Sequence, residues 1–390
     1  MTPLAYVSVR PLPVGPVLPQ SEGVAWMQAA LERSGVTGDA AVRARRLYGL
    51  LARQATVGSR ATCLEDFTHQ DWDRMRLFAA TPSGDGQAAA GGRTWTEPLL
   101  EDRMEVFAET ALRTAREAFA ADAEAPDALV QVSCTGYDSP TAVQRVALEK
   151  GWRPRILHIG HMGCYAALPA LATAADLVAA TAAQRAAAGA GAERADATAA
   201  ILLVELCTLH HKIEATAPEV IVQQCLFADG AARLDVSAAP PAAGGFALLA
   251  HHEALVPDSL DEMTWRVADS AFAMTLSRRV PDFIQAGLGG VVDGFLAEHG
   301  LARGDLDVAA VHPGGPRVIE AAQDALGLAD AQVAHSRAVL FDRGNMSSTT
   351  LPHIWDRIAG DDAIPAGALV LSLAFGPGLT IAANLMRKGG

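Results

Sequence analysis

Short apolar runs alternate with segments of helical spacing along most of the chain. A continuous apolar run that ends at a glycine, a proline or a small polar residue is typical of a buried strand. Such runs lie at Ala128–Cys134, Ile156–Ile159, Ala199–Cys207, Val308–His312 and Ala368–Ala374. Apolar residues three and four positions apart predict helices at Ser21–Ser34, Asp39–Ala55, Glu97–Ala121, Thr141–Lys150 and Pro218–Phe227. Alternating strands and helices predict an α/β protein.

The second half of the chain repeats this rhythm. A strand at Phe246–His251 is followed by helical segments over Pro281–His299, Arg317–Leu326 and Ser347–Ile358. The paired prolines and glycines of Asp235–Gly245 are typical of a crossing between two units. We therefore expect an internal duplication, with one half at residues 1–235 and the other at residues 236–390. A surface loop is expected at Thr81–Gly92 because glycine and small polar residues fill it.

The composition of the chain argues against several classes of function. Of the 390 residues, 50% are hydrophobic and 19% are charged, so a large dry core is expected. The formal charge of −13 argues against nucleic acid as a partner. We expect no membrane span, since no apolar run approaches the length that one needs. No basic segment precedes an apolar run near Met1, so no secretory signal is expected and the location predicted is the cytoplasm.

The cysteines are odd in number and widely spaced. The chain has 5 of them, and no pair has C-x-x-C spacing. Neither a disulfide framework nor a metal site is therefore expected, and the thiols are predicted to be free.

Cys164 is the first candidate for chemistry. It follows Gly163 at the end of an apolar strand, and an Ala- and Leu-rich segment of helical character runs from it to Ala180. A thiol at the first turn of a helix lies near unpaired N–H groups, which favour the thiolate and lower the thiol pKa. The alternative is a small buried hydrophobic residue at a strand–helix junction.

His312 and Asn345 extend this candidate site. His312 stands between an apolar strand and the turn Pro313–Pro316, and Asn345 lies in a loop immediately before a predicted helix. Taken singly, the histidine is often structural and the asparagine is often a helix cap. Together with Cys164 they form a set in which the imidazole holds the thiolate. The histidine and asparagine N–H groups would stabilise an enolate or a tetrahedral oxyanion.

Several motifs occur in one order that resembles a known family. They are Gly163–Tyr165, Val204–Cys207, Leu226–Ala232, Val311–Pro316, Gly344–Ser348 and Phe375–Thr380. These stretches, within a match from about Tyr48 to Leu385, resemble the type III polyketide synthases, the chalcone synthase-like branch of the thiolase superfamily. The resemblance is nearest to bacterial alkylpyrone and alkylresorcinol synthases.

The resemblance implies a homodimer of the duplicated, five-layered αβαβα thiolase fold. Cys164 would accept an acyl starter from acyl-CoA. His312 and Asn345 would bind the malonyl-CoA carbonyl, promote loss of CO2 and stabilise the enolate that extends the chain. Cyclisation would then give an α-pyrone or a resorcinol-type product. CoA thioesters are the substrates, and no cofactor is implied.

The resemblance also assigns substrate-binding positions. Phe227 matches an aromatic gatekeeper, with a plain core phenylalanine as the alternative, and Met274 stands roughly at a second gate position. The other positions are Cys134, Thr135, Cys207, His210, Ser347, Gly376 and Pro377. Glu205 matches a buried carboxylate that is expected to be structural. His210 and His211 are either solvated loop residues, or His210 points inward and steers the intermediate.

The predicted CoA-binding residues are few. Arg53, Arg60 and Gly314 fall at the expected positions, but relatives usually carry a denser basic cluster there. The donor could therefore be an acyl carrier protein. This leaves open an alternative function, a stand-alone ketosynthase that condenses two acyl chains delivered by carrier proteins.

Two alternative functions, from other classes of protein, fit the sequence less well. Papain-like proteases also use Cys, His and Asn in this chain order, but Pro313–Pro316 and Gly376–Thr380 have no place in them. A non-catalytic acyl-binding relative is expected to lack a member of the Cys-His-Asn set, and all three residues are present.

Overall fold

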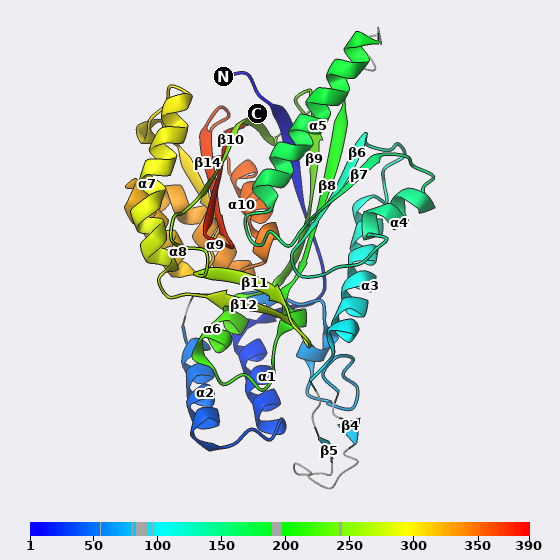
Figure 1. Ribbon diagram of the computed structural model, residues 1–390, viewed down its shortest axis with the longest axis vertical. Helices are drawn as coiled ribbons and strands as arrows, with labels where there is room; N and C mark the ends of the chain where they lie inside the picture. Colours follow the sequence, from blue (N-terminus) through cyan, green and yellow to red (C-terminus); the bar gives the residue numbers. More distant parts are fainter. Residues whose placement is uncertain (55, 80, 83–92, 95–96, 189–196, 242–243) are drawn as a thin grey trace.

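A mixed nine-stranded sheet runs through the molecule (Figure 1), with strand order β13-β14-β15-β10-β1-β9-β8-β6-β7. The computed structural model describes residues 1–390 except 55, 80, 83–92, 95–96, 189–196 and 242–243. The strands of this sheet are β1 (Ala5–Leu12), β6 (Ala128–Ser133), β7 (Arg155–Gly160), β8 (Thr198–Leu206), β9 (Asp229–Ser237), β10 (Phe246–Leu255), β13 (Val308–Val311), β14 (Leu369–Gly376) and β15 (Thr380–Lys388).

Strand pairing follows the same pattern in the two halves of the chain. In the first half, β9 pairs antiparallel with β1 and β8, and β8 pairs parallel with β6. In the second half, β15 pairs antiparallel with β10 and β14, and β14 pairs parallel with β13. The halves join where Ala5–Val7 of β1 pairs antiparallel with β10. This repetition agrees with the predicted duplication, while the boundary at residues 235 and 236, inside β9, stays a prediction.

Helices complete a layered arrangement. They are α1 (Gln20–Arg33), α2 (Gly38–Leu51), α3 (Leu100–Ala118), α4 (Ala142–Glu149), α5 (Ala167–Ala187), α6 (Pro218–Leu226), α7 (Val280–Glu298), α8 (Pro316–Leu326), α9 (Ala334–Arg343) and α10 (Thr350–Ala359). In Figure 1, α5 and α10 lie in the middle, α7 and α8 on one side, and α3 and α4 on the other.

Three hydrophobic cores account for these layers. The middle core packs α5 and α10, for example Leu171 and Trp355, against strands of both halves. One outer core packs α1, α3 and α4 on the first-half strands, and the other packs α7 and α8 on the second-half strands. Burial on both faces explains why β6, β8 and β14 read as continuous apolar runs. The layers are therefore α, β, α, β, α, as expected from the sequence.

Shorter strands complete the fold. A hairpin is formed by β11 (Met263–Val267) and β12 (Phe272–Leu276). Strand β2 (Val17–Pro19) pairs with β3 (Ser59–Ala61), and β4 (Thr81–Pro82) pairs with β5 (Arg93–Thr94). The rest of the loop predicted at Thr81–Gly92 lies outside the described residues.

Some local predictions were wrong. The run at Ile156–Ile159 was expected to be buried, but β7 ends the sheet, and none of its residues is fully buried because it has a neighbouring strand on one side only. Helix α9 was not predicted, and α7 is one helix where two segments were expected.

One described helix, α5, is long and apolar enough to cross a membrane by length and composition. The core helix of a soluble protein passes the same test, and residues of α5 such as Leu168 and Leu171 are fully buried in the middle core. The middle layer is thus a sufficient reason for the apolar character of α5.

Candidate active site

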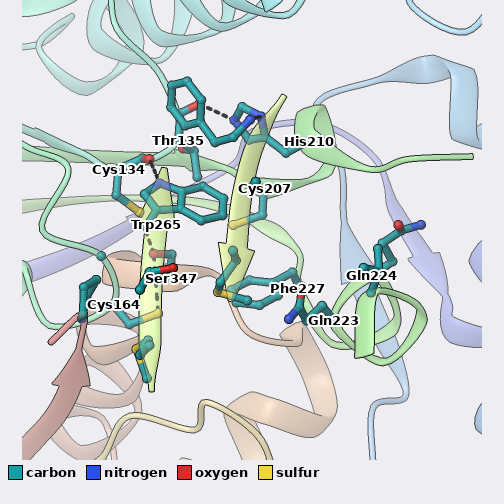
Figure 2. A pocket seen from close by; sticks show the side chains of 18 of the residues that line it. Cys134, Thr135, Cys164, Cys207, His210, Gln223, Gln224, Phe227, Trp265 and Ser347 are labelled. Carbon is teal, nitrogen blue, oxygen red and sulfur yellow. Dashed lines mark hydrogen bonds between the residues drawn. The ribbon is translucent and has the colours of Figure 1, made fainter. Parts of the chain in front are cut away.

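A pocket of about 900 Å³, part of it open to solvent, lies between the end of β6, helix α6 and the hairpin β11–β12. Figure 2 shows side chains from these elements converging on it. Most of the residues that the sequence assigned to substrate binding and catalysis line this pocket, namely Cys134, Thr135, Cys164, Cys207, His210, Phe227, Met274, Ser347 and Pro377. The other predicted residues, His312, Asn345, Gly376, Arg53, Arg60 and Gly314, are not among those that line it.

Cys164 lies in the turn between β7 and α5. Gly163 has a φ of +81°, and a Cβ there would lie 2.9 Å from Cδ of Pro377, so the turn requires glycine. The Ser347 hydroxyl donates a hydrogen bond to the Cys164 sulfur at 3.7 Å. This contact joins the segment before α5 to the segment before α10.

The thiol of Cys164 is protonated near neutral pH. The pocket leaves the residue partly exposed, yet burial raises the pKa of the Cys164 thiol to about 12. The predicted lowering of this pKa is therefore wrong for the structure. Helix α5 begins only at Ala167, and loss of water around the sulfur outweighs the hydrogen bonds from Ser347 and from the Cys164 backbone.

His312 follows β13, and its backbone N–H donates to the Leu373 carbonyl oxygen at 2.7 Å. The side chain is buried, at 1% exposure, and neither ring nitrogen has a hydrogen-bond partner among the described residues. Burial lowers the pKa of His312 to about 3, so the imidazole is neutral. The expected contact in which the His312 imidazole holds a Cys164 thiolate is thus absent from the described part of the chain.

Asn345 links the segments that carry the other two residues. Its Nδ2 donates to the Gly314 carbonyl oxygen at 3.4 Å, and its Oδ1 accepts from the Ser347 backbone N–H at 2.9 Å. The Gly314 N–H in turn donates to the His312 carbonyl oxygen at 3.0 Å. The structure therefore connects Cys164, Asn345 and His312 through Ser347 and Gly314.

Glu205 closes the far side of this network. Its carboxylate accepts from the Cys134 N–H at 3.0 Å, from the Thr135 hydroxyl at 2.8 Å and from the Ser348 hydroxyl. Burial raises the pKa of Glu205 against the opposing effect of these donors. The carboxylate fixes the ends of β6 and β8 beside the thiols.

The predicted CoA-binding arginines have different environments. Arg60 is buried, and its guanidinium donates to Gln20 Oε1 at 2.7 Å and to the carbonyl oxygens of Gln224 and Phe227 at 2.5 and 2.7 Å. A phosphate contact would require breaking these bonds. Arg53 is exposed beyond the end of α2.

Gly376 acts on the pocket indirectly. A Cβ at this position would lie 2.0 Å from the ring of Tyr165, the residue after the candidate nucleophile. The absence of a side chain therefore makes room for the Cys164 turn.

Both histidines of the adjacent pair are buried, so the solvated-loop interpretation was wrong. His210 Nε2–H donates to the Thr135 carbonyl oxygen at 2.7 Å, and its Nδ1 accepts from the Phe272 N–H at 3.0 Å. The ring also stacks on Phe272, with centroids 4.5 Å apart. His210 faces the pocket, but both of its nitrogens are occupied.

The hairpin β11–β12 contributes residues that the sequence analysis missed. Trp265 and Phe272 line the pocket, together with Met263. The usable signal was a pair of β-favouring runs, Met263–Val267 and Phe272–Leu276, separated by a short polar turn. His211 and Lys212, which follow His210 in the chain, also line the pocket and were not assigned to it by the sequence analysis.

Among the residues that the structure describes, no group of three or more His, Cys, Asp or Glu could hold a metal ion. The chemical groups of the site are instead thiols, hydroxyls, amides and neutral imidazoles around a mostly apolar pocket. This set suits covalent acyl chemistry at Cys164 with neutral hydrogen-bond donors nearby.

Known proteins resemble this chain in sequence and in fold. Residues 247–388 match the chalcone and stilbene synthase C-terminal domain. The chain is 31% identical over 286 residues to 1,3,6,8-tetrahydroxynaphthalene synthase of Streptomyces peucetius subsp. caesius, covering 72% of each chain. It is 29% identical over 296 residues to the alpha-pyrone synthesis polyketide synthase-like Pks18 of Mycobacterium tuberculosis, again covering 72% of each chain.

Solved structures agree. The structure of PKS-I from the brown alga Ectocarpus siliculosus superposes with a TM-score of 0.77 at 26% identity, covering 98% of each chain. That of 1,3,6,8-tetrahydroxynaphthalene synthase from Streptomyces coelicolor gives 0.76 at 24% identity over 100% of each chain. The chain belongs to the type III polyketide synthase family, enzymes of the thiolase fold that carry out acyl transfer.

Proposed function

We propose that this type III polyketide synthase carries its acyl chain on Cys164 and extends it with malonyl-CoA inside the pocket. The observation that carries this proposal is the contact of Ser347 with both the Cys164 sulfur and Asn345, since it gathers a thiol and an amide at the pocket. The Gly314 link brings His312 into the same assembly. Both helices of the middle layer begin near this point.

Loading begins with the Cys164 thiol and the His312 imidazole both neutral. A ring nitrogen of His312 takes the thiol proton as the sulfur attacks the thioester carbonyl of the acyl donor. The carbon–sulfur bond to CoA breaks, and the leaving thiolate takes the proton back from the imidazolium. With a pKa of about 3 the imidazole is unprotonated at neutral pH and is a weak base, so the thiol proton moves only as the new carbon–sulfur bond forms.

Extension needs an enolate but no strong base. Malonyl-CoA loses CO2, and the electrons of the broken carbon–carbon bond move onto the thioester oxygen. An N–H of His312 and the Nδ2–H of Asn345 stabilise that oxygen, which apolar surroundings make more effective than in water. The enolate carbon then attacks the acyl group on Cys164, a carbon–carbon bond forms, and the Cys164 sulfur leaves.

Repeated extension followed by cyclisation gives an α-pyrone or a resorcinol-type product. The likeness to a relative named for alpha-pyrone synthesis supports the first of these. Phe227 and Met274, as gates of the pocket, would limit the entering chain. No cofactor is required, because loading and extension are acyl transfers and a decarboxylation, and ring closure is an acyl transfer for a pyrone or an aldol condensation for a resorcinol.

The identity of the donor carrier can be tested against the alternative function. Arg60 is committed to backbone carbonyl oxygens, which leaves Arg53 and the region of Gly314 for a CoA phosphate. This observation favours testing acyl carrier protein as a donor, as a ketosynthase that joins two carried acyl chains would use it.

The decisive experiment supplies malonyl-CoA with acyl-CoA starters of two to sixteen carbons and identifies products by mass spectrometry. Products that disappear in Cys164→Ala support the proposal. Acylation of Cys164 from carrier protein alone would replace it with the ketosynthase function. Absence of acylation from both donors would refute a catalytic role for Cys164.

We also propose that the enzyme is a homodimer in the cytoplasm. The free edge of β7 supports the dimer, because an unpaired strand edge with half-buried Leu157 and Ile159 is suited to pairing with a second copy. Light scattering coupled to gel filtration tests this assembly, and a monomer at micromolar concentration would contradict it.

A further inference from the structure

His211 is a buried polar side chain that lines the active-site pocket. It is 4% exposed, and neither Nδ1 nor Nε2 has a partner among the described residues. Its neighbour His210 is equally enclosed but has both nitrogens bonded. An unpaired buried hydrogen-bonding group costs free energy, so the His211 ring is suited to a partner that arrives with a ligand.

The ring faces space that a ligand can fill. His211 lines the active-site pocket and also a smaller adjoining pocket of about 300 Å³ that includes Phe67 and Thr208. The imidazole packs edge-on against Phe67, with ring centroids 5.6 Å apart. This contact holds the ring in place without using either nitrogen.

Polar side chains also gather at the His211 end of the pocket. Lys212, Gln223 and Gln224 line it, and the Lys212 N–H donates to Gln224 Oε1 at 3.3 Å. In Figure 2, Gln224 lies well beyond Phe227 from Cys164. An acyl chain bound to Cys164 would pass Phe227 and other apolar side chains before it reached these polar groups.

The neutral ring of His211 can donate a hydrogen bond to an acceptor oxygen. Burial and the cations Arg60 and Arg103 hold the pKa of His211 well below its ordinary value, so the ring is neutral, with one N–H donor and one acceptor. Glu97 pairs with Arg103 at 2.5 Å and also feels Lys212 and Glu214. Arg60 also feels Asp229, and Arg103 also feels Asp102, so nearby carboxylates balance these cations, and Lys212 is the cation among the residues that line the active-site pocket.

We infer that His211 and Lys212 recognise an oxygen at the far end of the acyl chain, first of all a carboxylate. This inference rests on the proposed function, in which Cys164 carries the chain. A plain alkyl chain would leave the His211 N–H unpaired and buried, whereas an oxygen-ended chain would pair it. Lys212 would add charge complementarity for a carboxylate over a hydroxyl.

The test compares matched CoA thioesters of four to ten carbons that end in a methyl, a hydroxyl or a carboxylate. The rate of Cys164 acylation is read by intact-protein mass spectrometry, which needs no later step. His211→Phe is expected to lower the preference for oxygen-ended over methyl-ended chains by about ten- to a hundredfold. Lys212→Met should lower it by about tenfold for carboxylate-ended chains only.

Two further variants keep the outcome interpretable. His299→Phe, at a histidine that packs on Phe295 and does not line the pocket, should leave the preference unchanged. His211→Gln retains a donor and an acceptor and should keep the preference within about threefold, and it carries the test with Lys212→Met if His211→Phe does not fold.

The inference is overturned if the wild-type enzyme is acylated but prefers methyl-ended chains at every length. It is also overturned if His211→Phe and Lys212→Met change all chain types equally. Absence of Cys164 acylation by any thioester would instead defeat the proposed function, and the inference with it.

Discussion

The indole N–H of Trp265 donates a hydrogen bond to the backbone carbonyl oxygen of Cys134, at an N···O distance of 2.5 Å. This bond ties the hairpin β11–β12 to the end of β6 across the pocket. The His210 bonds to Thr135 and Phe272 tie the same two segments a second time. The hairpin is thus a fixed wall of the pocket.

Replacing Trp265 by Phe should therefore loosen that wall. The Cys134 carbonyl oxygen loses its donor, and we expect the free energy of unfolding to fall by about 1 kcal/mol. Urea unfolding of Trp265→Phe measures this change. An unchanged midpoint would show that the indole N–H contributes nothing to holding the hairpin.

Alkylation of Cys164 should depend steeply on pH. With a thiol pKa of about 12, the thiolate fraction rises about tenfold for each pH unit across the range from 7 to 10. The rate of modification by iodoacetamide at Cys164, followed by peptide mass spectrometry, should rise in proportion. A plateau between pH 5 and 7 would instead indicate a preformed thiolate–imidazolium pair with His312.

His312 should be required for decarboxylation independently of Cys164. Removal of one donor to a developing oxyanion typically costs about a hundred- to a thousandfold in rate. We expect His312→Ala to lower CO2 release from malonyl-CoA by that factor, while Cys164→Ala retains it. Equal loss in both variants would contradict separate roles for the two side chains.

Substitutions of the two arginines near the predicted CoA site should have different effects on stability and on CoA binding. Arg60→Met leaves the Gln224 and Phe227 carbonyl oxygens unpaired in the interior, so we expect a loss of about 3 kcal/mol in the free energy of unfolding. Arg53→Ala should change stability by less than about 0.5 kcal/mol but raise the KM for a CoA thioester. The pantetheine thioester, which lacks all of the phosphate groups of CoA, serves as the control substrate.

The difference in stability between the wild type and Glu205→Gln should depend on pH. Its pKa is raised in the folded state, so the folded protein holds the proton to higher pH than the unfolded chain does. The stability of the wild type relative to Glu205→Gln should therefore fall as pH rises from the unfolded pKa, near 4.5, through the folded one. Denaturant unfolding of both proteins at pH 4, 6 and 8 checks this, and a constant difference would show that Glu205 has an ordinary pKa.

The sequence predicts the strands of the layered fold because they are continuous apolar runs, such as Ala128–Cys134 and Ala199–Cys207. A strand that is buried on both faces is apolar at nearly every position, so its amino-acid sequence reveals it. The edge position of β7 could not be read in this way, since Ile156–Ile159 is as apolar as an interior strand. Helix α9 was missed because its polar residues obscure the narrow buried stripe of Ser336, Val339 and Leu340.

The candidate site was predicted as a list of residues but not as an arrangement. Cys164, Ser347 and Phe227 were found because they stand in glycine-rich motifs at the ends of elements. The protonation of Cys164 and the occupied nitrogens of His210 depend on desolvation and on partners distant in the sequence. Those are properties of packing, and no local pattern encodes them.

The position of the thiol and the amide before the two middle-layer helices also constrains how the enzyme acquires activity. Cys164 precedes α5 in the first half, and Asn345 precedes α10 in the second, so neither half alone contains the proposed machinery. During refolding, catalytic competence should therefore lag behind helix formation and arise only when the halves dock. Enzyme activity thus reports on the final assembly step, whereas circular dichroism reports on the earlier ones.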